Sequence, residues 1–555
     1  MRFRSQNSDL LLPEFMEGQI RESIDFLMGR RGLPMHRVTA FVSHKCNMFC
    51  DYCTGPHLTW REGDSARKKT MMRKDLTVEQ YTSYLADLVA HCDFIEHVHF
   101  TGGEATIKNY LPTLIQATTE QGVLSSITSN GIAAPSFYRS MIEKGLSEVR
   151  ISLDSYKAED FESAVHVKGA FQRVLDTIQE ITRLRDENGQ DVFLVLNACI
   201  GEANLERIRK TLRFLLSLNP NDLKFLLIVQ DKQFVMSQEN KELLKELHGY
   251  LTDYPSERYY LLRRKIDNLF NPDAAGLEDQ EAQEVMKHCF IPMTERTIDG
   301  QHYYPCSIYT RWYGEPIGEL DEPFEVQQEK SMKFVWEHDC RKDPICLKYC
   351  VNCCKLYNIN MNLALEAEKK IIETGEIIED TEEFSPELCE STLLLQQKYV
   401  KGVEDTENFD PTRLFLIIKP HGQPHRTEIL DLLKEKGIEI ESIQNIEDWA
   451  SFSTHFYCKE ASTASIKRAL SMGQAFSRLE KGKGEIVWFR KDPSPDVLLG
   501  IKYKIRSMFP SLRYTLRKGS QTHPIHVNAV HTPDEVDLAR ENTILFHVVD
   551  SGEFC

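Results

Sequence analysis

Apolar and polar residues alternate along the first half of the chain in two distinct patterns. Short apolar runs rich in β-branched residues predict buried strands, and the longer amphipathic stretches between them predict helices. Strands separated by helices favour parallel βαβ units, so we predict an α/β fold in which six such units form a partial (β/α)6 barrel. The expected strands are 38–42, 95–100, 124–128, 148–154, 192–197 and 223–229, and the clearest helices are 77–90, 170–185 and 204–218.

The pattern changes after residue 283, where the alternation of strands and helices gives way to a cysteine-rich stretch and then to an acidic one. A strand that breaks into a turn at 413–422 and a helix at 427–436 begin a separate α+β domain, which a helix from about 535 and a strand at 544–546 complete. We predict an N-terminal extension at 1–36, a barrel core at 37–283, an auxiliary domain at 284–360, a helical acidic linker at 361–411 and a C-terminal domain at 412–555.

Composition restricts the environment in which the chain works. Of the 555 residues, 41% are hydrophobic and 27% are charged, which is ordinary for a soluble globular protein. The net charge of −17 argues against bulk nucleic-acid binding and against an anionic membrane surface. The sequence has no apolar run long enough to span a bilayer and no apolar signal core in its first ten residues. We therefore expect a cytoplasmic protein with no membrane partner.

Fifteen cysteines in a chain of this kind indicate metal binding or catalysis rather than disulfides. Cys46, Cys50 and Cys53 follow the predicted strand 38–42 with the spacing C-x3-C-x2-C. Three thiolates on one short loop can hold three irons of a 4Fe–4S cluster and leave the fourth iron without a protein ligand. Half of a zinc site is the alternative, but no Cys or His pair lies close behind to complete a tetrahedron.

This spacing, together with the aromatic Tyr52 before the third cysteine, resembles the signature of the radical SAM superfamily. The resemblance implies that the open iron binds the amino and carboxylate groups of S-adenosyl-L-methionine. One electron, supplied by a reductase or by flavodoxin or ferredoxin, would then cleave this cofactor to methionine and a 5′-deoxyadenosyl radical.

The ends of the later strands extend the resemblance. Gly102-Gly103-Glu104 is similar to the GGE motif that holds the cofactor's amino group in this family, and a tight turn with a solvated glutamate is the alternative. The resemblance places Ser152 and Asp154 near the ribose hydroxyls, whereas capping of the following helix would also explain them. Asn130 is a further cofactor candidate, although it also suits a turn.

A second group of cysteines lies beyond the barrel. Cys289 and Cys306 flank an Asp-Gly turn, and this arrangement resembles the opening of the SPASM or twitch extension of radical SAM enzymes. The resemblance implies one or two auxiliary iron–sulfur clusters, and a structural zinc site is the alternative. Glu337 occupies the place of the first cysteine in the family's C-x2-C-x5-C-x3-C pattern. The other candidate ligands are Cys340, Cys346, Cys350, Cys353 and Cys354, with Cys389 as a possible addition.

The C-terminal segment resembles nucleoside diphosphate kinase, which implies a ferredoxin-like α+β domain. Lys419, at the end of a strand, matches that family's phosphate-contacting lysine, and His531 matches its phosphate-carrying histidine. A histidine that attacks a γ-phosphate is coherent chemistry, with Mg²⁺ as a possible companion of the nucleotide. His421 replaces the family's aspartate, so nucleotide binding without turnover and a docking or homo-oligomerisation module are alternatives. Asn528, Arg517 and Tyr457 are the further matches.

Together these patterns predict a radical SAM enzyme that modifies a nucleotide handled by the C-terminal domain. The second hypothesis is a peptide-modifying maturase with a non-catalytic C-terminal domain, because SPASM-type extensions commonly accompany peptide substrates. A redox or nucleotide sensor without cofactor cleavage is a third, non-enzymatic hypothesis.

Overall fold

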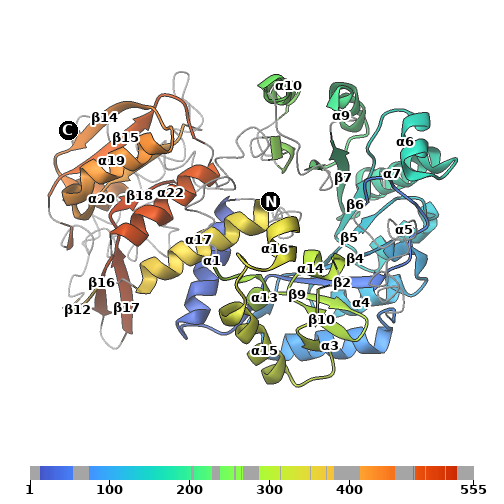
Figure 1. The fold of residues 1–555 in the computed structure, drawn as a ribbon, viewed down its shortest axis with the longest axis horizontal. Coiled ribbons are helices and arrows are strands. Elements are labelled where there is room, and N and C mark those ends of the chain that lie inside the picture. Colours follow the sequence, from blue (N-terminus) through green and yellow to red (C-terminus); the bar gives the residue numbers. More distant parts are fainter. Residues whose placement is uncertain are drawn as a thin grey trace. The chain divides into compact units, whose positions relative to one another are not determined.

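The sheet at the centre of the first unit is built from parallel strands, as the sequence predicts. In the described part of the chain, six strands are hydrogen-bonded side by side, and neighbouring strands are parallel throughout (Figure 1). In this order they are β2 (Arg37–Ser43), β4 (His97–Gly102), β5 (Leu124–Ser129), β6 (Glu148–Ser152), β7 (Phe193–Ile200) and β8 (Asp222–Leu227). The six predicted strands are therefore confirmed.

The computed structural model divides into two compact units, Met1–Asn358 and Ile359–Cys555. Among its described residues, no helix is both long and apolar enough to cross a membrane. The described residues are 13–53, 74–201, 205–227, 238–254, 258–259, 261–263, 265–266, 287–312, 314–350, 352–369, 372–379, 413–456, 479–480, 482–493, 495–509, 511–518 and 521–533.

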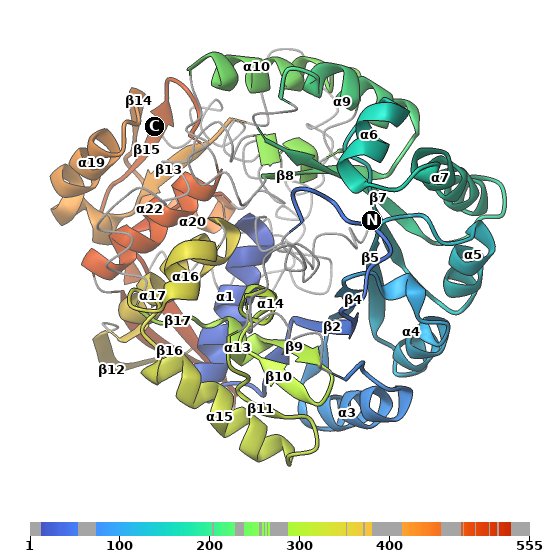
Figure 2. The ribbon, with the colours of Figure 1, turned by 45° about the vertical axis from the view of Figure 1, so that its right-hand side comes forward.

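Helices cover one face of the parallel sheet, as Figure 2 shows along the outer side of the strands. Helix α3 starts with a capping box in which the side chains of Thr77 and Gln80 each bond the other's backbone N–H. The ring of Tyr81 on this helix packs against Phe100 of β4 with 5.5 Å between ring centroids, and both rings are fully buried. The covering helices are α3 (Val78–His91), α4 (Leu111–Glu120), α5 (Pro135–Glu143), α6 (Ala158–Val165), α7 (Ala170–Asp186), α9 (Ile208–Ser217) and α10 (Gln238–Gly249).

The opposite face of the same sheet is polar. Side chains alternate between the two faces of a strand, so His97 and His99 lie on the face that Phe100 does not occupy. The strand pairing places Ser126 beside His99, and Arg150 beside Thr128. The inner face of the partial barrel is therefore lined by hydrogen-bonding groups, which suits a polar ligand better than an apolar core.

The cysteine-rich segment extends the sheet rather than forming a sheet of its own. β9 (Glu295–Asp299) pairs in parallel with β2, and β10 (His302–Tyr304) and β11 (Gly318–Glu319) continue it in antiparallel fashion. The predicted Asp-Gly hairpin is confirmed, because Gly300 turns the chain between β9 and β10 with φ +60°. The flanking helices are α1 (Pro13–Leu27), α13 (Ile291–Thr294), α14 (Ser307–Arg311), α15 (Phe324–Glu337), α16 (Pro344–Tyr349) and α17 (Asn352–Lys369).

The second unit contains an antiparallel sheet with the strand order β14-β15-β13-β18. Its strands alternate with helices in the chain order β13 (Phe415–Ile418), α19 (Arg426–Glu435), β14 (Ile440–Ile446), α20 (Trp449–Phe456), β15 (Gly484–Phe489), α22 (Pro495–Met508) and β18 (Val530–His531). The strand predicted at 413–422 and the helix predicted at 427–436 are confirmed. The helix expected from about 535 and the strand expected at 544–546 lie outside the described residues.

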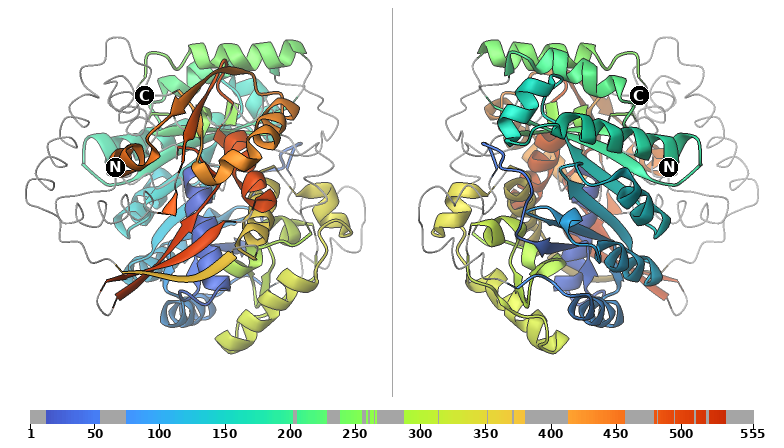
Figure 3. Two further views of the ribbon diagram at one scale, coloured as in Figure 1. Left: turned by 90° about the vertical axis from the view of Figure 1, so that its left-hand side faces the viewer. Right: turned by 90° about the vertical axis from the view of Figure 1, so that its right-hand side faces the viewer.

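The helical linker expected at 361–411 begins as predicted, since α17 extends to Lys369, but the expectation is wrong at 372–379, and residues 380–411 lie outside the described residues. The acidic stretch predicted to be helical forms the strand β12 (Ile372–Glu379), which pairs in parallel with β16 (Leu512–Lys518). β16 pairs in turn with β17 (Gln521–Val527), and Figure 3 shows β12 in yellow beside these two strands. The β-branched residues Ile372, Thr374, Ile377 and Ile378 favour a strand, and pairing with a partner strand outweighs the helical propensity of the glutamates.

Candidate active site

The cysteine loop leaves the end of β2 and is held against the end of β4 by backbone hydrogen bonds. The N–H of Gly103 donates to the carbonyl of Ser43 (2.8 Å), and the N–H of Glu104 donates to that of Lys45 (2.8 Å). A Cβ atom at residue 103 would lie only 2.5 Å from the Lys45 carbonyl oxygen, so this close approach requires glycine. The two glycines of the Gly-Gly-Glu motif therefore position the loop that carries the cysteines.

Cys46, Cys50 and Cys53 are half-buried cysteines on this loop, and none of the three forms a disulfide. Burial raises the pKa of the Cys46 thiol to about 11, and it raises that of Cys50 further, with Cys53 nearby adding to both shifts. The backbone N–H of Met48 donates to the Cys46 sulfur at 3.4 Å. Neutral thiols that lie together and already receive a hydrogen bond suit a bound cation, which would make them thiolates. The three residues thus fit the three-iron side of a 4Fe–4S cluster.

Glu104 ties the ends of β4 and β5 together from a buried position. Its carboxylate accepts hydrogen bonds from the Thr106 N–H (3.0 Å), the Ser129 hydroxyl (2.9 Å) and the Asn130 N–H (2.7 Å). Burial raises the pKa of this carboxyl, and the donors that surround it oppose the rise. The predicted contact of Glu104 with a cofactor amino group stays a prediction, since the chain itself supplies donors to both oxygens.

The side chain of Asn130 faces the cysteine loop. Its amide donates to the Asn47 side chain at 2.7 Å and lies 4.0 Å from the Cys46 sulfur. Ser152 is half-buried at the end of β6, where it pairs with Asn197 of β7. Both residues lie at the carboxyl edge of the sheet, where parallel barrels place their chemistry.

Asp154 connects the cysteine loop to β7. One of its oxygens accepts a hydrogen bond from the Tyr52 hydroxyl, and the other accepts one from the backbone N–H of Cys199 at 2.5 Å. Burial raises the pKa of the Asp154 carboxyl, while the Cys199 N–H and the Tyr52 hydroxyl work against that rise. The sequence selected Tyr52 and Asp154 separately as cofactor residues, and the structure brings them into direct contact.

Two features of this site were not anticipated from the sequence. The guanidinium of Arg311, on α14, lies 5.1 Å from the centre of the Phe41 ring and donates to the Thr101 hydroxyl at 3.4 Å. Burial lowers the pKa of the Arg311 guanidinium, whereas the nearby Cys53 thiolate favours its charged form. A single arginine far from the motif gives no sequence signal.

The second unanticipated feature is a buried pair of His44 and Asp299, whose Nε2 and Oδ1 atoms are 2.6 Å apart. His44 precedes the first cysteine by two residues, and Asp299 ends β9. The pair therefore joins the cysteine loop to the strand contributed by the auxiliary segment. The position of His44 within the motif is the one signal that could have drawn attention to it.

The polar face of the barrel contains a connected set of side chains below the cysteine loop. The Ser126 hydroxyl lies 2.6 Å from His97 Nε2 and 2.7 Å from His99 Nδ1. Burial, with Arg150 nearby, lowers the pKa of both histidines, which keeps the imidazoles neutral. Arg150 itself is bonded to Glu148.

Some of the buried polar atoms on this face have no hydrogen-bond partner among the described residues. They are Nδ1 of His97, Oε2 of Glu148, Nη2 of Arg150 and Oδ1 of Asn197. All four side chains are at least nine-tenths buried. Buried polar groups are normally satisfied, so these atoms mark a place for water or for the polar groups of a ligand.

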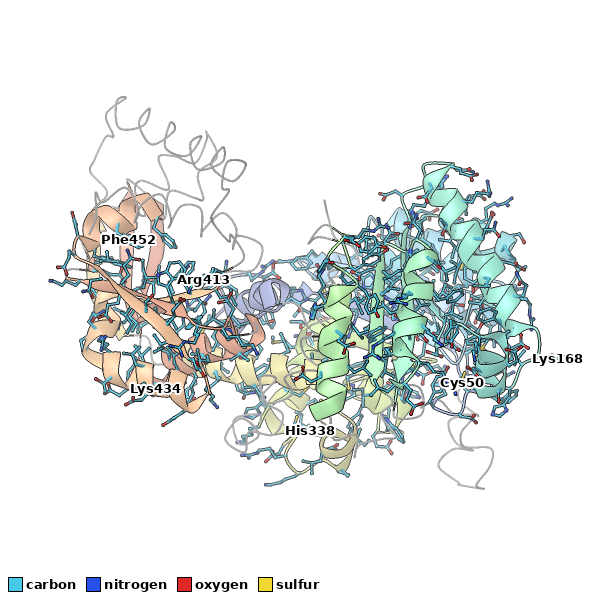
Figure 4. All side chains as sticks on the ribbon, turned by 90° about the horizontal axis from the view of Figure 1, so that it is seen from above. Cys50, Lys168, His338, Arg413, Lys434 and Phe452 are labelled. Atoms are coloured by element: carbon cyan, nitrogen blue, oxygen red, sulfur yellow. The ribbon has the colours of Figure 1, made fainter. Side chains whose placement is uncertain are left out.

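The auxiliary segment brings several of its cysteines together at a second place in the first unit. His338 of this segment lies apart from Cys50, as Figure 4 shows. Cys340 is buried, and its thiol shares hydrogen bonds with the thiols of Cys289 and Cys346. Cys306 caps α14 by accepting from the Tyr309 N–H at 3.4 Å, and its thiol feels the charges of Cys289 and Cys346. These four predicted metal ligands therefore converge.

The other predicted ligands of this segment are Cys350, Cys353 and Cys354, with Cys389 as an addition. Cys350 is half-buried at the end of α16, where its N–H donates to the Cys346 carbonyl at 3.3 Å. Cys353 and Cys354 belong to α17, but their side chains lie outside the described residues, as does Cys389. The sequence reasoning missed His338, whose Nε2 lies 3.5 Å from the Cys346 sulfur.

In the second unit, Lys419 is buried and its ammonium pairs with Glu480 at 2.9 Å. The other oxygen of Glu480 accepts from the Trp449 indole N–H at 2.8 Å. His531 is half-buried on the strand that pairs with β13, and its ring meets the edge of Phe456 at 5.3 Å between centroids.

The remaining predicted residues of this unit are Asn528, Arg517 and Tyr457. Asn528 accepts a hydrogen bond from the Ser511 hydroxyl. Arg517 lies in β16, but its side chain is outside the described part of the structure, and so is the whole of Tyr457. Lys419 and His531 thus come from adjacent strands, but the lysine charge is already neutralised by Glu480.

Comparison with known families identifies one segment of the chain. Residues 41–215 match the family model described as the radical SAM superfamily. This segment is a radical SAM domain. The matched residues run from β2 to α9 and include the three loop cysteines, the Gly-Gly-Glu motif and Asp154.

Named relatives match part of the chain at low identity. A PqqA peptide cyclase of Rhizobium meliloti is 24% identical over 145 residues, which cover 26% of this chain and 35% of that protein. A probable GTP 3′,8-cyclase of Metallosphaera sedula is 27% identical over 189 residues, covering 34% of this chain and 54% of that protein. The chain thus spans about a third to a half of the length of these relatives.

Solved structures resemble the chain only distantly. SuiB of Streptococcus suis bound to S-adenosylmethionine aligns with 57% of this chain and 67% of its own, at 15% identity and a TM-score of 0.37. Native anSMEcpe with bound AdoMet aligns with 57% of this chain and 88% of its own, at 14% identity and a TM-score of 0.40.

Proposed function

We propose that the chain is a radical SAM enzyme that modifies a polar substrate in the mouth of its partial barrel. The observation that carries the proposal is the set of Cys46, Cys50 and Cys53 on one loop at the carboxyl edge of six parallel strands, inside the radical SAM domain. When bound, a 4Fe–4S cluster and S-adenosylmethionine supply a 5′-deoxyadenosyl radical on receipt of one electron from a flavodoxin, a ferredoxin or a reductase.

The residues of the chain hold and orient these groups. The three cysteines would supply the thiolates, and the Asn130 amide and the Met48 N–H are placed to donate to the Cys46 sulfur. Tyr52 and Asp154 fix the loop to the strand ends. The Gly-Gly-Glu motif, Gly102, Gly103 and Glu104, holds the cysteine loop close to the end of β4. Ser152 lies at the carboxyl edge of the sheet, where the ribose would bind.

The polar inner face supports a substrate rich in hydrogen-bonding groups. Arg150 and Asn197 each present an unpartnered buried polar atom within the described structure, as do His97 and Glu148. Neutral imidazoles at His97 and His99 can donate and accept without adding charge. Such a lining is suited to the amide groups of a peptide or to the base and ribose of a nucleotide.

We propose a nucleotide as the first substrate class, with the C-terminal unit as a ferredoxin-like domain related to nucleoside diphosphate kinase. The strand order supports this relationship: numbered along the chain, the strands of the sheet run 2-3-1-4, with helices between them. Lys419 and His531 on neighbouring strands would contact and accept phosphate, and Asn528 and Arg517 would assist, with Mg²⁺ accompanying the nucleotide.

A peptide is the second substrate class, and the ion pair between Lys419 and Glu480 favours it. A lysine whose charge is neutralised by a buried carboxylate is poorly available to a phosphate. The C-terminal unit would then bind a nucleotide without turnover, or serve as a docking or homo-oligomerisation module. With either substrate class, the cysteines of the auxiliary segment would hold one or two auxiliary metal centres.

The test of the proposal is anaerobic reconstitution followed by reduction in the presence of S-adenosylmethionine. The wild-type chain should form 5′-deoxyadenosine, and Cys50→Ala should reduce it to background. The matched control is Cys92→Ala, because Cys92 caps α3 and lies outside the motif. Equal 5′-deoxyadenosine formation by Cys50→Ala would contradict the assignment.

Substrate class is tested by adding nucleotides or candidate precursor peptides to the same assay. A nucleotide substrate predicts that nucleotides raise 5′-deoxyadenosine formation and yield a modified product, and that His531→Ala abolishes any phosphotransfer while sparing radical chemistry. Stimulation by peptides alone would favour the second class.

A further inference from the structure

The second group of cysteines contains three donor atoms that lie unusually close together. Nitrogen of His338 and the sulfurs of Cys340 and Cys346 all lie within 4.8 Å of one another. The His338 Nε2 to Cys346 Sγ distance is 3.5 Å. The His338 nitrogen and the two sulfurs therefore surround a single point. Cys289 lies beside this group, because its thiol is within hydrogen-bonding reach of the Cys340 thiol.

These separations decide how many metal ions the group can hold. With Zn–S bonds of about 2.3 Å and Zn–N bonds of about 2.0 Å, a tetrahedral zinc ion places its nitrogen and sulfur ligands about 3.5 Å apart and its sulfurs about 3.8 Å apart. In a 4Fe–4S cluster each cysteine binds a different iron, so an iron–iron edge and two outward bonds separate any two thiolates. In a 2Fe–2S cluster only two ligands share an iron. Three donors that all lie within 4.8 Å of one another fit a single ion better than either cluster.

The surroundings hold this geometry without a metal. The His338 ring stacks on Phe334 with 4.2 Å between centroids, and Tyr309 meets it edge-on at 6.1 Å. Asp343 caps α16 by accepting from the Cys346 N–H at 2.8 Å, and it also accepts from the Tyr309 hydroxyl at 3.2 Å. Packing and capping thus fix the directions of His338 and Cys346, as outer residues commonly do around metal ligands.

Cys289 has its own outer partner. The Asn358 amide donates to the Cys289 sulfur at 3.5 Å, and it is part of the helix α17 that follows the cysteines. Cys306 also lies near Cys289 and Cys346, and its sulfur accepts from the Tyr309 N–H at the start of α14. Cys289 is the better fourth donor beside His338, Cys340 and Cys346, because its thiol bonds directly to that of Cys340.

We infer that these four residues form a structural zinc site of the Cys3His type, in place of an auxiliary iron–sulfur cluster. Cys3His is an established ligand set for structural zinc, and a closed tetrahedron suits stabilisation rather than catalysis. The ion would fasten the end of α15, the start of α16 and the stretch before α13. The inference concerns the second site alone and stands or falls independently of the radical SAM activity.

The experiment uses the full chain carrying Cys46→Ala, Cys50→Ala and Cys53→Ala, purified anaerobically, so that the first cluster cannot contribute iron. Elemental analysis should find about one zinc per chain and neither iron nor acid-labile sulfide. After exchange for Co²⁺, the visible spectrum should show the bands of a tetrahedral cobalt thiolate. Iron with sulfide at this site, or no bound metal, would overturn the inference.

Variants in this triple background identify the ligands. His338→Ala should lower zinc affinity by 10-fold or more, of the order seen when metal-site residues are removed. His338→Cys should restore zinc binding, because a fourth thiolate also completes a tetrahedron. Asp339→Asn is the matched control, since this neighbouring carboxylate forms ion pairs with Arg341 and Lys342, and it should retain full zinc. Zinc retained fully by His338→Ala, with unchanged cobalt bands, would remove His338 from the ligand set.

Discussion

The Tyr52 hydroxyl donates a hydrogen bond to the buried carboxylate of Asp154, which in turn accepts from the backbone of Cys199. This contact fastens the loop that carries the cluster cysteines to the ends of β6 and β7. Tyr52 and Asp154 are 102 residues apart in the sequence, so the loop is positioned by tertiary structure and not by its own turns alone.

Tyr52→Phe should therefore loosen the loop. The substitution keeps the ring and leaves one oxygen of a buried carboxylate without its donor, at a cost of about 1–3 kcal/mol in the free energy of unfolding. We expect lower iron occupancy after reconstitution and less 5′-deoxyadenosine, measured together with a denaturant unfolding curve. Tyr156→Phe is the matched control, and iron content equal to wild type in Tyr52→Phe would contradict the role assigned to this hydrogen bond.

Gly103→Ala should displace the cysteine loop. The added methyl group would lie 2.5 Å from the Lys45 carbonyl oxygen and 2.6 Å from that of His44, and backbone atoms cannot move aside as a flexible side chain can. We expect about 1–3 kcal/mol of destabilisation and reduced binding of the first cluster, measured by thermal unfolding and iron analysis.

The control for this glycine is Gly18→Ala, because an added Cβ there meets nothing within 4 Å on helix α1. It should be neutral or slightly stabilising, since alanine favours helix over glycine. Similar losses in both variants would show that the close approach at Gly103 is not the cause.

Asp222 should make stability depend on pH. Burial raises the pKa of this carboxyl from its ordinary value of 3.8 to about 7, against hydrogen bonds from the backbone of Leu261, Leu223 and Leu262. The folded state therefore keeps a proton that the unfolded state releases. Its contribution to stability is fully present below pH 3.8 and is lost as the pH rises towards about 7, with a slope of at most ~1.4 kcal/mol per pH unit.

Asp222→Asn should remove this pH dependence, because the amide does not titrate in that range. It should also lower stability by about 1–3 kcal/mol, since an amide offers one acceptor where the carboxylate serves three N–H groups. Denaturant unfolding at a series of pH values between 4 and 8, for wild type and variant, measures both effects. Parallel curves for the two proteins would contradict the raised pKa.

Lys419→Met should destabilise the second unit strongly. The Lys419 and Glu480 side chains are only 4% and 0% exposed, so removal of the lysine leaves a buried carboxylate with no cation, at a cost of about 3–5 kcal/mol. The double variant Lys419→Met/Glu480→Gln should recover much of that loss. Thermal unfolding of the full chain measures these changes.

The control is Arg426→Met, which breaks an ion pair with Glu485 whose arginine is 40% exposed. Exposed pairs contribute about 0–1 kcal/mol, so this change should be small. A loss in Lys419→Met no larger than in Arg426→Met would contradict the importance of the buried pair.

Local patterns predicted much of the first unit, because its parallel strands carry apolar residues on the face that the helices cover, and the helices between them are amphipathic. The cysteine loop and the Gly-Gly-Glu motif were also visible, since their residues are close in sequence. Contacts between distant segments were not predictable in this way. The pair of His44 and Asp299, the position of Arg311 and the convergence of His338 with the cysteines depend on which strands become neighbours.

The second unit shows the same division. Strand β13 and helix α19 follow from local patterns, whereas β12 was expected to be helical because its partner β16 lies far along the chain. The motif residue Lys419 could be recognised, but the carboxylate that neutralises it comes from a part of the sequence with no recognisable signal.

The parallel pairing of β9 with β2 has a practical consequence for dividing the chain. β9 protects what would otherwise be an open edge of the sheet, directly beside the strand that leads into the cysteine loop. A fragment ending before Glu295 would leave the amides and carbonyls of β2 free to pair with other molecules, as unprotected edges commonly do. Shortened versions intended for crystallisation or spectroscopy should therefore retain the hairpin that follows residue 294.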